Sequence, residues 1–307
     1  MGFWGVALRG YAMGAAELVP GVSGGTIAFI SGLYGPLLAS LAAFDGTFLQ
    51  LLRRGDLRAA FDHVHGRFLL TLVLGMGAAI LSLAALLKFL LATQAMLLWA
   101  FFFGLILASA VHVALSVGRW SALEGAAATL GVISGAWLTV LGGSLSLSEG
   151  PLALFFGGAL AVCAWILPGV SGSFLLLVLG LYDRVLGAIA GVVIPDLLAL
   201  ATGCGLGLLL FVRLLQRLLL RARKATLAAL GGFMFGALQM LWPWQRIEAY
   251  QLGRDGAMRV LRSEPLGPGA YAQFYGEDPQ LWAVAGLMCL GVAVVWGLAR
   301  GQGYDGA

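Results

Sequence analysis

Glu17-Leu-Val-Pro-Gly-Val-Ser-Gly-Gly-Thr26 is a helix-breaking stretch within a long apolar region, and it returns in altered form as Trp165-Ile-Leu-Pro-Gly-Val-Ser-Gly-Ser-Phe174. Proline and glycine interrupt a helix and free backbone N–H and C=O groups, which hydrocarbon cannot satisfy. A matched pair of such breaks is typical of a functional site. The alternative is a pair of tight turns that only allow close helix packing.

The composition is that of a polytopic membrane protein. Of 307 residues, 61% are hydrophobic and 10% are charged, whereas soluble domains carry about 25% charged residues. The net charge of +4 needs no nucleic-acid partner, because basic residues on cytoplasmic loops are the ordinary orientation signal of membrane proteins. We expect no cleaved signal peptide, since cleavage would leave the first motif without its first helix.

Ten apolar segments predict an all-α fold of membrane helices. A span needs about 20 apolar residues, and the first, sixth and ninth segments are short or interrupted. Their predicted bounds are 3–19, 22–44, 68–92, 95–117, 121–141, 151–167, 170–194, 196–220, 225–242 and 281–299.

The chain repeats internally. A shift of 148 residues places the first Pro-Gly-Val-Ser-Gly on the second and Gly32-Leu-Tyr34 on Gly180-Leu-Tyr182. With smaller shifts, Gly75-Met-Gly77 resembles Gly203-Cys-Gly205 and Phe102-Phe-Gly104 resembles Met234-Phe-Gly236. We therefore predict one integral membrane domain made of two repeats of five segments, 1–145 and 150–300.

An odd number of segments per repeat reverses the second copy in the membrane, and the charges agree with this topology. If each motif-bearing pair enters and returns on one side, the main basic clusters all face the cytoplasm together with both termini. The first hairpin then enters from the cytoplasm and the second from outside. The residues concerned are Arg53, Arg54, Arg58, Arg67, Arg119, Arg217, Arg221, Arg223, Lys224 and Arg300.

Two connecting segments stand out. Segment 45–67 mixes apolar residues with arginines, so it is either an interfacial amphipathic helix or an ordinary loop. Segment 243–280 is predicted to lie outside, and its role is open.

The motif itself favours an anion site. After the proline, Ser23 and Ser171 can each act as N-cap of a new helix, and helix N-termini attract anions, phosphate in particular. Two inverted broken helices that meet near the bilayer midplane are a recurring transporter design. We therefore predict that an anionic group binds between Ser23, Gly24, Gly25 and Thr26 on one side and Ser171, Gly172 and Ser173 on the other.

Charged residues in the apolar segments extend this predicted site. Arg9 and Arg184 are candidates to hold a phosphate, because a guanidinium matches its geometry. Glu17 and Asp183 are candidate coupling groups or charge partners. Asp183 and Arg184 are adjacent, so they point apart on a helix and each should find its partner elsewhere. The alternative for Arg9, Asp183 and Arg184 is a place at the membrane surface.

An enzyme is the weaker hypothesis. Gly21-Val-Ser-Gly24 matches the G-x-S-G of rhomboid-type intramembrane serine proteases, but that chemistry needs a histidine base, and His112 is the only histidine in a predicted membrane segment. A lipid phosphatase would need arginines clustered with histidines. Cys163, Cys204 and Cys289 have no metal-type spacing, so we predict no catalytic residue, metal or cofactor.

The motif residues also carry a resemblance. Gly10-Tyr-Ala-Met-Gly-Ala-Ala-Glu-Leu-Val-Pro-Gly-Val-Ser-Gly-Gly-Thr26, with Leu167-Pro-Gly-Val-Ser-Gly-Ser-Phe174 and Gly180-Leu-Tyr182, resembles the PopT-type polyprenyl-phosphate translocases, a family formerly catalogued as a domain of unknown function. The resemblance covers nearly the whole chain. It implies a flippase in the bacterial plasma membrane that returns undecaprenyl phosphate to the cytoplasmic leaflet, where the carrier lipid is reused in peptidoglycan synthesis.

Two matters remain open at this level. A proton or sodium gradient could drive transport, since one charge crossing 100 mV supplies about 2.3 kcal/mol. The competing hypothesis within transport is a secondary carrier for a small soluble anion, which would need a sealed aqueous path in place of a lateral opening to the lipid.

Overall fold

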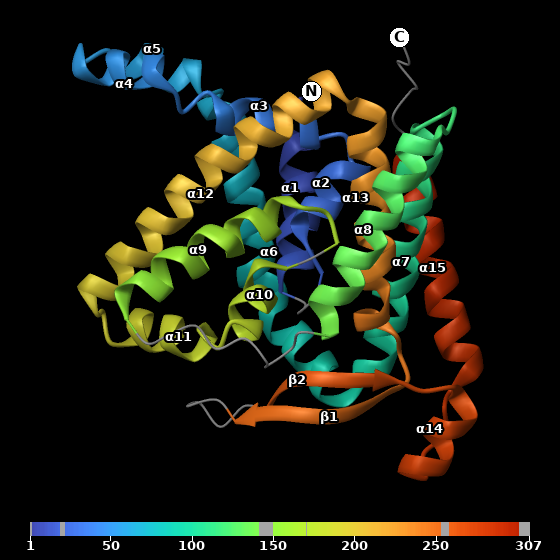
Figure 1. Ribbon diagram of the computed structural model, residues 1–307. Helices are drawn as coiled ribbons and strands as arrows, with labels where there is room; N and C mark the ends of the chain where they lie inside the picture. The colour runs from blue at the N-terminus through green and yellow to red at the C-terminus, as the bar shows by residue number, and fades with distance from the viewer. Residues whose placement is uncertain (1, 19–21, 141–149, 170, 253–257, 301–307) are drawn as a thin grey trace.

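The computed structural model describes residues 2–18, 22–140, 150–169, 171–252 and 258–300, and most of them are helical (Figure 1). All ten predicted apolar segments are helical. The first half contains α1 (Phe3–Glu17), α2 (Gly24–Ile30), α3 (Tyr34–Ala42), α4 (Gly46–Arg53), α5 (Leu57–His63), α6 (Gly66–Thr93), α7 (Ala95–Ser116) and α8 (Ala122–Val140).

The second half follows a similar order of helices. It contains α9 (Pro151–Ile166), α10 (Gly172–Val178), α11 (Tyr182–Ala190), α12 (Ile194–Arg221), α13 (Arg223–Ala237) with a short 3-10 turn (Leu238–Leu241), β1 (Gln245–Leu252), β2 (Met258–Pro265), α14 (Pro268–Tyr275) and α15 (Leu281–Arg300). Helices α6 and α12, which occupy matching places in the two halves, have 28 residues each.

The apolar segments 22–44 and 170–194 are each broken into two helices, a division that their apolar length alone did not predict. The chain turns at Gly32 and Gly180, whose φ angles of 73° and 70° favour glycine. Helices α2 and α3 meet at a bend of 116°. The matched Gly-Leu-Tyr triplets of the two halves mark these turns, so the signal was present in the repeat.

Four helices among the described residues are long and apolar enough to cross a membrane, or five if the bent α2–α3 pair counts as one span. Helices α9 and α15 contain shorter apolar stretches. Large apolar side chains also remain on the outside of the bundle, such as Leu81 on α6 and Leu220 on α12, which are 89% and 86% exposed. An exposed apolar surface of this kind is expected where helices face lipid.

Glycine allows the long helices to pack with their backbones in contact. On α8 and α13, a Cβ at Gly131 or Gly236 would overlap a carbonyl oxygen of the facing helix, which is the small-residue packing common in membranes. The same kind of contact joins α1 to α6 at Gly10 and Gly75, and α9 to α12 at the matching Gly158 and Gly203. Helix α7 packs on α15 as α13 packs on α8.

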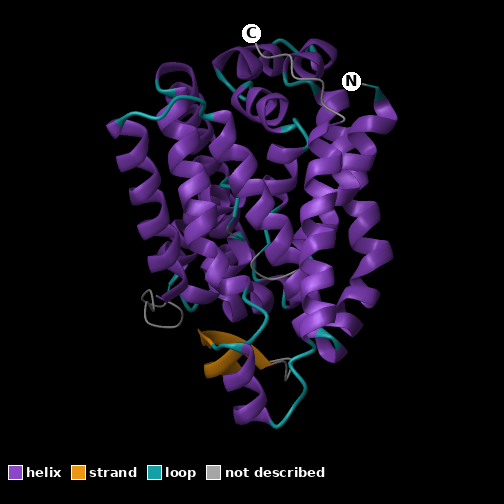
Figure 2. Cartoon of the chain, turned by 90° about the vertical axis from the view of Figure 1, so that its right-hand side faces the viewer, coloured by secondary structure: helices purple, strands orange, loops and turns teal. Residues whose placement is uncertain are grey.

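The two ends of the bundle differ. Figure 1 shows α3, the α4–α5 pair and the α7–α8 and α12–α13 connections at one end, whereas β1, β2 and α14 lie at the other, and Figure 2 agrees. The first group carries the basic residues of segment 45–67 together with Arg119, Arg221, Arg223 and Lys224. Helix α11, the counterpart of α3, lies toward the opposite end from α3 (Figure 1).

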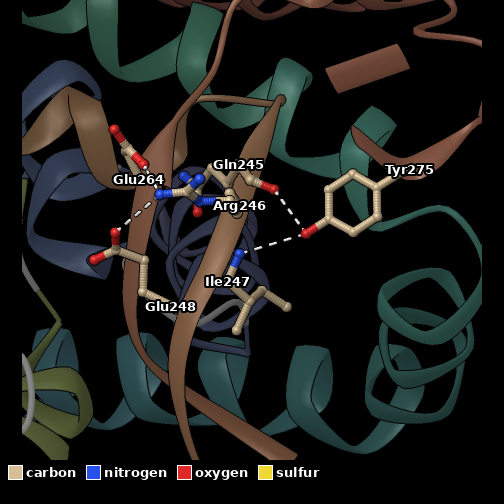
Figure 3. A network of polar contacts seen from close by, with 6 residues as sticks. All are labelled: Gln245, Arg246, Ile247, Glu248, Glu264 and Tyr275. Atoms are coloured by element: carbon tan, nitrogen blue, oxygen red, sulfur yellow. Dashed lines mark hydrogen bonds and ion pairs between the residues drawn. The ribbon is translucent and has the colours of Figure 1, made fainter. Parts of the chain in front are cut away.

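Segment 243–280, predicted only as an outside loop, folds into an antiparallel β1–β2 hairpin and helix α14. Arg246 of β1 pairs with Glu264 of β2 at 2.5 Å and with Glu248 at 3.4 Å. The Tyr275 hydroxyl accepts from the Ile247 N–H and donates to the Gln245 carbonyl, which attaches α14 to β1 (Figure 3).

Segment 45–67 was expected to be either an amphipathic helix or an ordinary loop, and the structure shows that it is largely helical. Asp45 and Asp56 act as N-caps of α4 and α5, and each accepts a backbone N–H at 3.0 Å. The His63 ring at the end of α5 reaches back to Asp45 at 3.1 Å. The caps and this ion pair shape α4 and α5 into a short arm.

Candidate functional site

At the first break, polar groups of the motif itself accept hydrogen bonds from the N–H groups that begin α2. Helix α1 ends at Glu17, and Ser23 is the N-cap of α2, where its hydroxyl accepts the Gly25 N–H at 3.0 Å. The Glu17 carboxylate accepts the Gly24 N–H at 2.6 Å. Two of the N–H groups that a helix N-terminus leaves unpaired are therefore satisfied within the motif, one of them by a carboxylate.

The second break has a different local structure. Ser171 is the N-cap of α10, as predicted, but its hydroxyl makes no capping hydrogen bond. That hydroxyl instead lies 2.7 Å from the hydroxyl of Ser173. Gly169 has φ = 101°, a conformation that other residues rarely adopt.

The two breaks contact each other directly. The Ser23 hydroxyl donates to the Trp165 carbonyl at 3.1 Å, and the Gly169 N–H donates to the Thr26 hydroxyl at 2.9 Å. At the start of α3, just after the bend, the Tyr34 hydroxyl donates to the Ile166 carbonyl at 3.2 Å. These three hydrogen bonds, called the interlock below, join segments more than 130 residues apart in the sequence.

The interlock lies in the interior of the bundle. Ser23 and Thr26 are 0% exposed and Ser171 is 1% exposed. A Cβ at Gly25 would lie 2.9 Å from the carbonyl oxygens of both Trp165 and Ile166. Hydrogen bonds between buried polar groups are well protected, and leaving one partner unpaired is costly.

Glu17 and Trp165 occupy equivalent positions of the two motifs, and they also meet. The Trp165 side chain lies near the Glu17 carboxylate, which accepts the Gly24 N–H. An acid in one half thus faces an aromatic donor in the other. Glu17 is half-buried.

The other predicted charges are engaged within the chain. Arg184 of α11 forms two hydrogen bonds with the Asp196 carboxylate of α12, from Nε and Nη2, both at 2.9 Å. Its predicted partner elsewhere in the chain is therefore found. Arg9 and Asp183 are half-buried and also interact with other residues.

The structure thus brings Ser23, Gly25 and Thr26 against Trp165–Gly169, and Glu17 against Gly24. Sequence reasoning missed Tyr34 and Asp196 as partners. Tyr34 belongs to the repeated Gly-Leu-Tyr triplet, which was a usable signal. Asp196 could have been found as a carboxylate at the start of an apolar segment, where a charge needs a partner.

The contacts of the Ser23 hydroxyl do not favour a nucleophile. It accepts from the Gly25 N–H and donates to a backbone carbonyl, and neither partner is a base. Within the part of the chain that the structure describes, no three His, Cys, Asp or Glu residues are grouped as metal ligands. Cys204 lies against the Gly158 carbonyl at 3.4 Å, as expected of a small packing residue.

These features define a polytopic helical membrane protein with two broken helices in contact at its centre. The chain matches the family described as undecaprenyl phosphate translocase-like (VCA0040-like) over residues 13–258. It is 39% identical over 300 residues to the polyprenyl-phosphate transporter of Vibrio cholerae, covering 98% of this chain and 97% of that protein. It is 32% identical over 259 residues to the polyprenyl-phosphate transporter of Staphylococcus aureus, covering 78% and 86%.

The chain belongs to the undecaprenyl phosphate translocase-like family. No solved structure matches it significantly. Because the family and both relatives are named for transport, the predictions that the chain resembles this family and is not an enzyme are confirmed.

Proposed function

We propose that this protein is a flippase that moves undecaprenyl phosphate from the outer to the cytoplasmic leaflet of a bacterial plasma membrane. The observation that carries the proposal is the interlock, a contact between two matched helix breaks in the interior of a membrane bundle. The names of the relatives supply the substrate class. A phosphate cannot cross hydrocarbon unshielded, so the protein shields the head while the prenyl tail stays in lipid.

We infer that residues 1–145 and 150–300 are inverted repeats. The packing of α1 on α6 matches that of α9 on α12 and supports this relation. In addition, each half packs one helix on the other half in the same way, α8 on α13 and α15 on α7. The placement of α3 and α11 toward opposite ends also supports it. The basic end of the bundle then faces the cytoplasm, together with both termini.

The proposed head-group site comprises both motifs and two arginines. In the described conformation the Ser23 hydroxyl, the Gly24 and Gly25 N–H groups and Arg184 donate to other groups of the chain, so this conformation is a closed state of the proposed cycle. Opening the interlock frees the hydroxyl and N–H groups of the motifs for the phosphate oxygens. The residues are Ser23, Gly24, Gly25, Thr26, Ser171, Gly172, Ser173, Arg9 and Arg184.

Glu17 is the proposed coupling group, with Asp183 as the second candidate. The Glu17 carboxylate already occupies an N–H of the α2 N-terminus, and a phosphate there would meet a like charge. Protonation of Glu17 would remove this repulsion, so proton entry and head-group binding would favour each other. A sodium ion beside the carboxylate would act in the same sense.

Reconstitution tests the proposal. Liposomes containing the protein and labelled undecaprenyl phosphate are followed for the leaflet that holds the head group, with and without proton or sodium gradients. We expect faster exchange than in protein-free liposomes, and a slower rate for Ser23→Ala than for Ser116→Ala, an exposed serine that only bonds its own helix. Equal rates with and without protein would overturn the lipid proposal, and uptake of inorganic phosphate in place of lipid movement would favour the soluble-anion carrier.

A further inference from the structure

A second feature of the molecule lies away from the paired breaks, between the arm and the start of α6. A cavity of about 450 Å³ opens there, within the range of about 300–1,000 Å³ typical of ligand pockets. Its lining is apolar throughout, apart from one glycine. The main contributors are Phe44, Phe48, Leu57, Phe61, Leu69 and Val73. We call this cavity the arm groove.

The arm groove opens toward the lipid. Leu70 and Val73 line it from α6 and are 53% and 60% exposed, and the adjacent Leu74, which does not line it, is 59% exposed. These residues begin the apolar stretch of α6 that is long enough to cross a membrane. The groove is therefore at the level where a spanning helix leaves the hydrocarbon, and its wall continues the apolar surface of α6.

Cations flank the residues that line the arm groove. Arg53, Arg54 and Arg58 of the arm and Arg67 in the first turn of α6 are all exposed. The neighbouring acids Asp45 and Asp56 are held as helix caps, and with Asp62 they leave the segment with one net positive charge. Arg213 of α12 adds a further cation, because its guanidinium donates to the Phe44 carbonyl at 3.0 Å.

An apolar groove with a cationic rim at the membrane surface complements an amphiphile with an acyl chain and an anionic head. We propose that the arm groove binds one acyl chain of an anionic phospholipid whose head group lies among these arginines. This lipid is a molecule distinct from the transported one, because the proposed transport function places the transported head at the paired breaks. Figure 1 shows α4 and α5 projecting sideways from the bundle, where such a lipid would fill the space beneath the arm.

Two neighbouring residues offer a matched pair of variants. Val73→Trp places a large ring in the groove, whereas Leu74→Trp places the same ring on the lipid-facing surface one residue away. Both side chains are exposed to nearly the same extent, so neither change should disturb the bundle. Equal unfolding temperatures for the two variants check this directly.

The experiment uses the full-length protein in nanodiscs with phosphatidylglycerol carrying a photoreactive group at the end of one acyl chain, and phosphatidylcholine with the same chain as the comparison probe. We expect labelling of peptides within residues 44–73, stronger for phosphatidylglycerol by about fivefold or more, since each arginine near an anionic surface contributes roughly that factor. Val73→Trp should lower the labelling several-fold, and Leu74→Trp should not.

Charge variants and competition complete the test. The combined change Arg53→Gln, Arg54→Gln and Arg58→Gln should abolish the preference for phosphatidylglycerol, while Arg119→Gln at the same end of the bundle should retain it. Excess unlabelled phosphatidylglycerol should compete more strongly than undecaprenyl phosphate. Equal labelling by both probes, equal effects of the two tryptophan variants, or stronger competition by undecaprenyl phosphate would each overturn the proposal. The assay measures lipid contact and not transport, so its outcome is independent of the proposed function.

Discussion

The two helix breaks share Pro-Gly-Val-Ser-Gly but differ in what they do with it. In the first break, Ser23 caps α2 and Glu17 accepts the next N–H. In the second, the hydroxyl of the N-cap residue Ser171 makes no capping hydrogen bond and pairs with Ser173. The position of Glu17 is taken by Trp165, and that of Thr26 by Phe174. The duplicated motif has thus diverged into a charged, polar half and an aromatic half that contact each other.

This difference suggests a division of roles within one site. The first break supplies the hydroxyls and the carboxylate, and the second supplies backbone carbonyls, an N–H and an aromatic donor. A symmetric pair would carry two coupling charges, whereas here the single acid is in the first motif. Equivalent substitutions in the two motifs should therefore have unequal effects.

The largest inequality is expected at Gly25 and its counterpart Ser173. Gly25→Val places side-chain atoms against the Trp165 and Ile166 carbonyls, already 2.9 Å from the first added carbon. Overpacking of this kind costs about 1–3 kcal/mol and forces the breaks apart, so transport should be lost and the unfolding temperature lowered. Ser173 is exposed, so Ser173→Val should stay within about 0.5 kcal/mol. If Ser173→Val lowered the unfolding temperature as much as Gly25→Val, the predicted difference between the two breaks at this position would be wrong.

The second inequality concerns Glu17 and Trp165. Glu17→Gln keeps the shape and an acceptor for the Gly24 N–H, but it removes the negative charge that strengthens this hydrogen bond, and with it the proposed coupling charge. The transport rate in liposomes should fall roughly tenfold or more and lose its dependence on the ion gradient. Trp165→Phe removes one neutral donor and should slow transport less while keeping that dependence. A gradient response that survives Glu17→Gln would move the coupling role to Asp183.

The third comparison is between the two serines that begin α2 and α10. Ser23→Ala removes a helix cap, at a cost of about 1 kcal/mol, together with the bond to the Trp165 carbonyl. Ser171→Ala removes only the contact with Ser173 and should cost less, because the Ser173 side chain left behind is exposed. Thermal unfolding in detergent measures both, and a larger loss at Ser171 would contradict the assignment of the capping role.

Much of this architecture could be predicted from the sequence, because the signals were local. The ten helical segments follow from apolar length, and the breaks follow from Pro-Gly. What could not be predicted were contacts that depend on tertiary packing. The Thr26–Gly169 and Tyr34–Ile166 hydrogen bonds join residues whose spacing carries no local pattern, and the β1–β2 hairpin forms in a polar segment that hydropathy marks only as a connection. The assignment of Arg9 and Arg184 to the head group stays a prediction.

The smallest expected effect concerns the arm, an element of the first half without a described counterpart in the second. The Phe48 N–H and then His63 hold the pKa of Asp45 below its usual range. A depressed carboxyl pKa stabilises the fold above the unfolded pKa of about 3.9, and that contribution is lost as the pH falls through the lower folded value. The stability difference between wild type and Asp45→Ala should shrink as the pH falls below about 4. Unfolding temperatures from about pH 5 downward measure it, and a difference that stays unchanged as the carboxyl is protonated would contradict the cap assignment.

The central claim is that the two breaks hold one phosphate head together. Undecaprenyl phosphate with a photoreactive group beside the phosphate, activated in membranes containing the protein and followed by peptide mass spectrometry, tests it most directly. We predict crosslinks in both motifs, at residues 17–26 and 165–174, and their loss from both motifs in Gly25→Val. Crosslinks confined to one motif, or found only outside both, would contradict a shared site.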